Sequence, residues 1–226
     1  MEEIQSHGEI SLAHFGVLFL DELPEFKKST LEVLRGPLEN KYVTISRANM
    51  AVTYPSNFIL IASMNPCPCG YYGTDDDKCH CSETAISNYM GKLSGPLLDR
   101  IDLHIEVKSV EYEKISSEEK GETSKEIKKR VDKARKIQLE RYKNLNIYSN
   151  GELTPKLIEK YCKIDETSKE LLRKAFEKLG LSGRAYSRIL KVARTIADLD
   201  GEDEIRKNHI AEAIQYRSLD RKYWKR

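Results

Sequence analysis

The sequence has no long hydrophobic run and almost no net charge. No apolar stretch approaches the roughly 20 residues that a membrane-spanning helix requires. The start, MEEIQSHGEI, also lacks the apolar segment of a secretory signal. We therefore expect no membrane association and a cytoplasmic location. The formal net charge is only +2, so binding to nucleic acid must be argued from local patches rather than from overall charge.

A second absence concerns nucleotide chemistry, because the sequence contains no G-x-x-x-x-G-K-[ST], the phosphate-binding loop of P-loop enzymes. The chain is otherwise ordinary for a folded protein. Its 226 residues can form one larger and one smaller domain. Its 39% hydrophobic content is too high for general disorder, although 33% of the residues are charged.

The first half of the chain indicates an α/β fold. Residues 16–22 (GVLFLDE) and 58–63 (FILIAS) are continuous apolar runs, typical of parallel strands that helices cover on both faces. Between them we expect a helix over 29–38, which stops near Gly36 and Pro37, and a hairpin over 42–54. Residues 102–107 (DLHIEV) predict a third strand.

The second half predicts helices only. A polar, glycine-containing stretch follows residue 109, and everything beyond it has helical periodicity. We expect a core domain at 1–110, a linker at 111–123 and a helical domain at 124–226. The expected helices are 124–144, 154–162, 166–179, 185–199 and 207–217. Residues 124–143 hold nine Lys/Arg against three Asp/Glu, and 217–226 hold five against one, but such runs usually mark solvated faces.

The strongest chemical signal is the carboxylate pair Asp21-Glu22 at the end of an apolar strand. Open α/β sheets bind ligands at the carboxyl ends of their strands. In a Walker B strand the first carboxylate holds the Mg²⁺ of a nucleotide, and the second polarises the water that attacks the γ-phosphate. Asp21 and Glu22 fit these roles, although an isolated strand-end Asp-Glu is more often merely solvated.

Three further residues fit the same site. Asn65 follows the next core strand, where an amide can hold the attacking water without adding charge. Arg100 stands between a short helix and the third predicted strand, from where it could reach a phosphate on a neighbouring subunit or pair with a nearby aspartate. Arg184 lies in the first turn of a helix that Ser182 should cap.

Four of the five cysteines fall within residues 67–81, namely Cys67, Cys69, Cys79 and Cys81. In a cytoplasmic protein such clusters are more often metal ligands than disulfides, and four thiolates can close a tetrahedral Zn²⁺ site. The C-x-C spacing differs from the usual C-x-x-C, so a redox or free-thiol cluster and a role in packing alone stay alternatives. Cys162, inside a helical stripe, should belong to the core.

Several segments taken together resemble the magnesium-chelatase-like AAA+ proteins of the ComM/YifB type over nearly the whole chain. They are GEISLAHFGVLFLDELPEF, SMNPCPCGYYG, SGPLLDRIDLHIEV and SGRAYSRILKVARTIADL. The resemblance implies an AAA+ core with a helical lid, ATP and Mg²⁺ as cofactors, and a hexameric motor on DNA that acts in branch migration during natural transformation. It also implies a Walker B at Asp21 and Glu22, sensor 1 at Asn65, an arginine finger at Arg100 and sensor 2 at Arg184.

The family's phosphate-binding loop would lie upstream of residue 1, so we expect this chain to be a C-terminal segment that hydrolyses no ATP alone and leaves sheet edges exposed. The hairpin precedes sensor 1 and carries Arg47 at its tip and Lys41 at its base, so we expect DNA contacts there. The alternatives are a chelatase-type motor for metal insertion, which needs neither hairpin nor cysteines, and a non-catalytic interaction module.

Overall fold

The computed structural model describes residues 8–47, 50–73, 78–107 and 121–217. The chain forms two compact units, residues 1–101 and residues 102–226. Most of the predicted linker, up to residue 120, lies outside the described residues, as do Ala48 and Asn49 of the hairpin tip. Within the described ranges, every helix is too short or too polar to cross a lipid bilayer.

The first unit is built around a two-stranded parallel sheet. Strand β1 (Val17–Leu20) pairs with β4 (Ile59–Ala62), with Val17 opposite Ile59 and Leu20 opposite Ala62. Both strands fall inside the apolar runs that predicted them. Because the strands are parallel, the residues that follow them, Asp21 and Ser63, emerge at the same edge.

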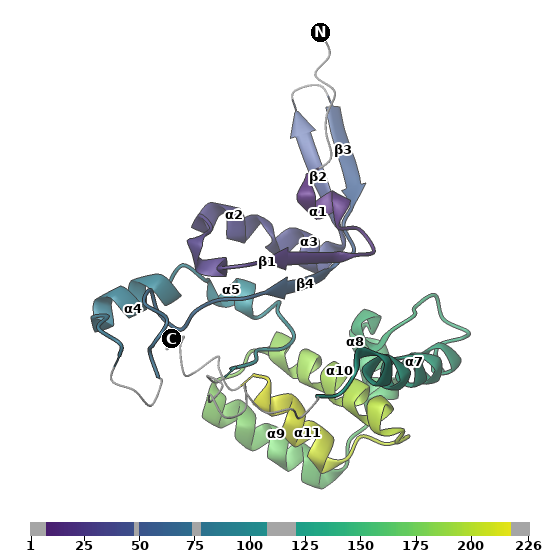
Figure 1. The fold of residues 1–226 in the computed structure, drawn as a ribbon. Coiled ribbons are helices and arrows are strands. Elements are labelled where there is room, and N and C mark those ends of the chain that lie inside the picture. Colours follow the sequence, from purple (N-terminus) through teal and green to yellow (C-terminus); the bar gives the residue numbers. More distant parts are fainter. Residues whose placement is uncertain (1–7, 48–49, 74–77, 108–120, 218–226) are drawn as a thin grey trace. The chain divides into compact units, whose positions relative to one another are not determined.

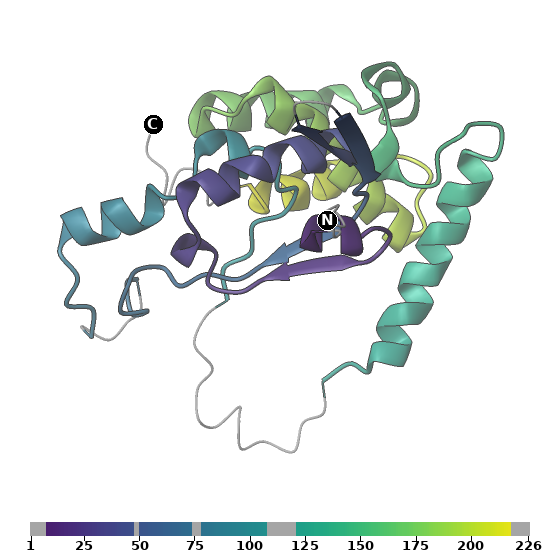
Figure 2. The same cartoon turned by 90° about the horizontal axis from the view of Figure 1, so that it is seen from above.

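Helices cover one face of this sheet and not both, which corrects the expectation from the sequence. Helices α2 (Lys28–Val33), α3 (Arg35–Asn40) and α5 (Gly95–Leu98) lie on one side of β1 and β4 (Figures 1 and 2). The side chains of the other face are mostly exposed: Val17 53%, Phe19 58%, Ile59 64% and Ile61 49%. The apolar runs call for cover on both faces, but the described residues of this unit supply helices for only one.

The prediction that the helix over 29–38 stops near Gly36 and Pro37 was wrong. It is two helices, α2 and α3, and the second begins at Arg35 and runs through Gly36 and Pro37. Proline is tolerated there because it occupies the first turn, where its missing N–H has no partner within the helix. Lys41 then ends α3 with a left-handed φ of 65°.

The predicted hairpin is present. Strands β2 (Tyr42–Arg47) and β3 (Met50–Pro55) pair antiparallel, with Arg47 opposite Met50. The hairpin extends away from the β1–β4 sheet as a narrow arm (Figure 1). At its base the Ser56 N–H donates to the carbonyl of Lys41 at 2.8 Å. The remaining elements of this unit are α1 (Glu9–Leu12), the 3₁₀ turn η1 (Leu23–Glu25) and α4 (Glu83–Met90).

The predicted third strand was wrong, because residues 102–107 form no strand. The His104 N–H of this segment donates to the Tyr216 carbonyl at 2.9 Å. Ile105 is 66% exposed and Val107 84% exposed. A strand needs a neighbour that accepts and donates along its length, and the described residues offer none here.

The second unit is helical, as predicted. Its elements are α7 (Ser124–Arg141), η2 (Asn150–Glu152), α8 (Pro155–Tyr161), α9 (Glu166–Leu179), α10 (Gly183–Asp200) and α11 (Lys207–Gln215). The predicted Ser182 cap is confirmed, because its Oγ accepts the Ala185 N–H at 3.2 Å, and Pro155 occupies the first position of α8. One isolated parallel bridge joins Ile164 to Ile205.

Helix α10 is the centre of this unit's core. Its apolar stripe of Ala185, Ile189, Ala193 and Ile196 is buried, and Cys162 packs in the same cluster as predicted.

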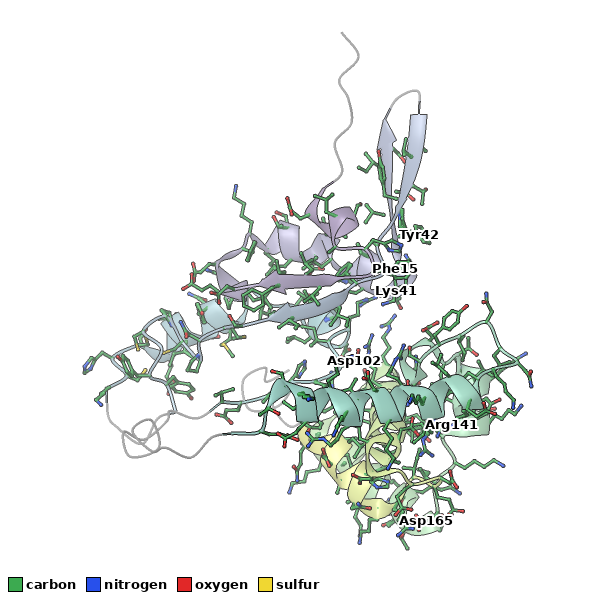
Figure 3. All side chains as sticks on the ribbon, turned by 45° about the vertical axis from the view of Figure 1, so that its right-hand side comes forward. Phe15, Lys41, Tyr42, Asp102, Arg141 and Asp165 are labelled. Carbon is green, nitrogen blue, oxygen red and sulfur yellow. The ribbon has the colours of Figure 1, made fainter. Side chains whose placement is uncertain are left out.

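A buried ionic network completes the core. Asp198 is fully buried and accepts from Arg194 Nε at 3.1 Å, from Arg141 Nη1 at 2.9 Å and from Asn150 Nδ2 at 2.8 Å. Charged-group hydrogen bonds of this kind offset the cost of taking a carboxylate out of water. Arg141 therefore ties the C-terminal end of α7 to α10 (Figure 3).

Candidate functional site

The carboxyl edge of the β1–β4 sheet gathers the predicted carboxylates. Asp21 follows β1, and its Oδ1 accepts the Glu22 backbone N–H at 2.9 Å and the hydroxyl of Ser63, which follows β4. The Leu23 N–H in turn donates to the Ser63 carbonyl at 2.9 Å. The two strand ends are therefore tied together, and both hydrogen bonds to the Asp21 carboxylate end on its Oδ1.

Both carboxylates are exposed at this edge. Oxygen ligands from one or two carboxylates, completed by phosphates and water, are the set that Mg²⁺ prefers in nucleotide sites, so Asp21 and Glu22 fit that ion. Glu22 has φ 51° and ψ 48°, a left-handed conformation that is uncommon outside glycine. It turns the chain directly into η1, where Leu23 and Pro24 are buried. Such local strain tends to occur at functional sites.

Asn65 continues the same edge, two residues after Ser63, and is exposed. The phenol of Tyr89, from the end of α4, lies beside its backbone. Burial raises the pKa of Tyr89, although the backbone hydrogen bond at Asn65 opposes the change. A neutral phenol thus supports the backbone of Asn65 and leaves its amide side chain exposed.

Arg100 is not exposed. It is 8% accessible, its Nε donates to Glu39 Oε2 at 3.0 Å, its Nη2 contacts the same oxygen, and its Nη1 donates to the Pro96 carbonyl at 2.7 Å. The predicted alternative was a pair with a nearby aspartate, whereas the partner is a glutamate at the end of α3. For Arg100 to act on another subunit it must first leave Glu39.

The remaining predicted residues belong to other elements. Arg184 is exposed in the first turn of α10, in the helical unit. Lys41 is exposed at the base of the hairpin beside Tyr42 (Figure 3). Arg47 ends β2, so its backbone stands at the far end of the hairpin, while its side chain lies outside the described residues.

The four clustered cysteines converge on one point. The sulfur atoms of Cys67, Cys69, Cys79 and Cys81 all lie within 4.8 Å of one another. The Cys67–Cys69, Cys67–Cys79 and Cys69–Cys79 separations are 3.3, 3.8 and 3.7 Å. Four sulfurs at the roughly 2.3 Å bond length of a tetrahedral Zn²⁺ site lie about 3.8 Å apart, so the donors fit that ion.

The ionisation of these thiols is unequal. The backbone N–H of Tyr71, with help from neighbouring thiols, lowers the pKa of Cys69 to about 6. A backbone hydrogen bond at Cys69 acts the opposite way on Cys81, but neighbouring thiols and desolvation still raise the pKa of Cys81 to about 12. The pKa of Cys79 is raised for similar reasons. The Cys69 thiolate therefore forms easily, whereas the thiols of Cys79 and Cys81 resist ionisation, as expected for a cluster that lacks a positive charge.

Two family models cover most of the chain. One, described as "Magnesium chelatase, subunit ChlI", matches residues 2–115, and the other, "Magnesium chelatase, subunit ChlI C-terminal", matches residues 121–217. The chain belongs to the magnesium chelatase ChlI family.

Within this family the chain is most clearly similar to bacterial members. It is 49% identical over 219 residues to the competence protein ComM of Haemophilus influenzae and 45% identical over 219 residues to the YifB protein of Salmonella typhimurium. It is 24% identical over 212 residues to the chloroplastic magnesium-chelatase subunit ChlI of Glycine max. These alignments cover 96%, 96% and 92% of this chain but only 42%, 42% and 43% of the relatives. The chain thus spans about two fifths of the length of these proteins.

Two residues that contact the candidate site residues were missed in the sequence. Ser63 anchors Asp21, and its signal was available as the polar residue that ends the second apolar run. Glu39, the partner of Arg100, gave no such signal, because the two residues are 61 positions apart and meet only in the folded chain.

Proposed function

We propose that this chain supplies the hydrolytic edge and the helical lid of a ring-forming AAA+ ATPase that acts on DNA. On this proposal residues 1–110 belong to the AAA+ core, 111–123 link it to the lid, and 124–226 form the lid. The observation that carries the proposal is the tied strand edge, where Asp21 and Glu22 follow one parallel strand and Ser63 and Asn65 follow the other.

Each residue of the edge has a role in this proposal. Asp21, oriented by Ser63, holds the Mg²⁺ shell of ATP, and the exposed Glu22 polarises the attacking water. The Asn65 amide positions that water or a γ-phosphate oxygen. When bound, Mg²⁺ neutralises charge on the phosphate oxygens. Arg184 contributes from the lid, as the sensor 2 residue of the family would.

Arg100 is the residue that makes the proposed site depend on a neighbouring subunit. We propose that in an assembled hexamer the guanidinium leaves Glu39 and reaches the nucleotide bound by the neighbouring subunit. A planar, permanently charged group is suited to the transition-state charge. In this chain the half-exposed Glu39 carboxylate pairs with the buried Arg100 guanidinium, so the proposed finger is held within its own subunit.

DNA contact is proposed at the hairpin. It is joined through Pro55 to the segment that leads into β4, so movement at the Asn65 edge has a short covalent path to the hairpin. One arginine per subunit, Arg47, with Lys41 at the base, would line a ring channel and bind backbone phosphates without reading sequence. The alternative role of the hairpin is packing against a neighbouring subunit.

The cysteine cluster is proposed as a structural Zn²⁺ site. Its four sulfurs have tetrahedral spacing and no open position for a substrate. When bound, Zn²⁺ would hold the loop between Cys67 and Cys81 closed directly after sensor 1. We propose no redox role, because a closed four-thiolate site binds its metal through every sulfur.

A chelatase-type motor that inserts a metal is the second candidate. Identity to the ChlI subunit of Glycine max is about half the identity to ComM, and this favours the DNA motor. A non-catalytic module is the third candidate for the isolated chain, since it contains no phosphate-binding loop. ATP turnover tests the proposal: the chain alone should hydrolyse no ATP, and turnover after a phosphate-binding loop is supplied should depend on Glu22.

A further inference from the structure

The outward face of α7 carries a stripe of lysines that the proposed function has not used. At 100° per residue, Lys125, Lys129, Lys133 and Lys136 fall within about 80° of the helix circumference and span about 16 Å along the axis. All four are exposed. The buried residues of this helix, Ala134 and Gln138, lie on the opposite side.

The ammonium groups of this stripe have no ion pair among the described residues. Acidic residues on or near α7 are taken by other cations: Asp132 pairs with Lys128 at 3.2 Å, Glu122 pairs with Arg130, and Glu140 pairs with Lys143 at 2.5 Å. Over 124–141 the helix holds eight Lys/Arg against three Asp/Glu. Within the part of the chain that the structure describes, the positive charge on this face is therefore not neutralised.

Helix α9 shows what a merely solvated charged face looks like in the same unit. Three of its four cations are paired along the helix: Lys169 with Glu166, Arg173 with both Glu170 and Glu177, and Lys174 with Glu170. Such i,i+3 and i,i+4 pairs are the usual arrangement on an exposed helix. The lysine stripe on α7 lacks such pairs, although both helices belong to the same unit.

The position of α7 makes the stripe accessible. The N-terminal half of the helix has no buried residue and extends beyond the other helices of its unit (Figure 2). A capping box at Thr123 and Glu126 fixes its start. The C-terminal half is anchored by the Arg141–Asp198 pair. The lysines thus stand on a rigid element rather than on a loop.

We infer that the outer face of α7 is a second nucleic-acid contact, in which Lys125, Lys129 and Lys136 bind backbone phosphates. This inference rests on the proposed DNA function and adds a site in the helical unit to the hairpin contact. A polyanion complements an uncompensated row of positive charges. An anionic membrane is less suitable, because the stripe contains no apolar residue that could insert between headgroups.

The test measures binding of fluorescent mixed-sequence DNA, single-stranded and duplex, to the 226-residue chain by anisotropy at 50 mM and 200 mM salt. The key variant changes Lys125, Lys129 and Lys136 to Gln. Lys133 stays, because its Nζ lies close to Gly201 after α10. The matched control changes Lys169, Lys174 and Lys178 of α9 to Gln, which removes the same charge. A third variant changes the three α7 lysines to Arg.

The α7 Gln variant should bind DNA at least about tenfold more weakly at 50 mM salt. On duplex DNA, its loss of affinity between the two salt concentrations should be roughly fortyfold smaller than that of wild type, because three phosphate contacts are gone. The α9 control and the α7 Arg variant should bind like wild type. Circular dichroism should show unchanged helix content, since Gln and Lys have similar helix propensity.

Other results would overturn the inference. If the α7 and α9 Gln variants weaken binding equally, only net charge matters. If the α7 Gln variant binds DNA like wild type while Arg47→Ala weakens binding, the hairpin alone contacts DNA and the proposed function stands without this site. If wild type binds no DNA at 50 mM salt, the inference and the DNA part of the proposed function both fail. If the variant loses binding only to phosphatidylserine vesicles, the face is a membrane contact.

Discussion

Zinc binding at Cys67, Cys69, Cys79 and Cys81 should strengthen steeply as the pH rises. A thiol must lose its proton before it can ligate a metal. Cys69 has a pKa of about 6 and is already ionised near neutral pH, whereas the pKa of Cys81 is about 12 and that of Cys79 is raised. Zinc that binds at neutral pH therefore displaces at least two protons.

The size of the effect follows from this proton count. Each displaced proton increases the apparent affinity about tenfold per pH unit, so two protons give about a hundredfold, or about 2.7 kcal/mol, between pH 6.5 and pH 7.5. Below pH 6 the slope should steepen further, because Cys69 also becomes protonated. Competition with a chromogenic chelator at several pH values measures the slope, and elemental analysis should find about one zinc per chain.

A matched pair of variants controls the zinc experiment. Ser at both Cys67 and Cys79 should release the metal, since only two thiolates remain. Cys162→Ala removes a cysteine from the core of the other unit and should retain it. An affinity that changes less than tenfold across this pH unit, or protein purified without chelators that contains no zinc, would refute the reasoning.

Two further predictions concern the core of the lid and the hairpin. Asp198→Ala leaves Arg194 buried without its counter-charge and should lower the free energy of unfolding by about 3–5 kcal/mol. Glu177→Ala, at an exposed ion pair, should change the free energy of unfolding by less than about 1 kcal/mol. Equal urea midpoints for the two variants would contradict this prediction. Arg47→Ala should weaken DNA binding similarly for all sequences and reduce the salt slope by about one; unchanged affinity in anisotropy titrations would move the contact elsewhere.

The sequence predicted the elements whose signal is local. The two apolar runs gave β1 and β4, the alternating residues around Ser46 gave the hairpin, and the Ser182 cap with its apolar stripe gave α10. The cysteine cluster was also local in effect, because its four residues lie within one short segment. Each of these elements is decided by periodicity, capping or proximity along the chain.

The features that the sequence did not predict depend on contacts between residues far apart in the chain. Residues 102–107 have the composition of a strand, but no strand forms without a neighbour to pair with. The Arg100–Glu39 pair joins residues 61 positions apart. Gly36 and Pro37 predict the end of a helix, because the sequence does not show that a second helix begins at Arg35. The exposed face of the β1–β4 sheet could not be predicted either, because the apolar runs do not show on which face the helices pack.

ATP turnover tests the central claim most directly, namely that the Asp21–Glu22 edge hydrolyses ATP in a ring. The assay uses a chimera in which the N-terminal part of the Haemophilus influenzae ComM protein precedes this chain. From the family resemblance we expect that part to carry the phosphate-binding loop. We predict DNA-stimulated turnover that Glu22→Gln lowers at least about a hundredfold. Arg100→Ala should also abolish it, and mixing the two inactive variants should restore part of the rate, because some interfaces then combine an intact Glu22 with an intact Arg100. Turnover that Glu22→Gln leaves at the wild-type rate would contradict the account.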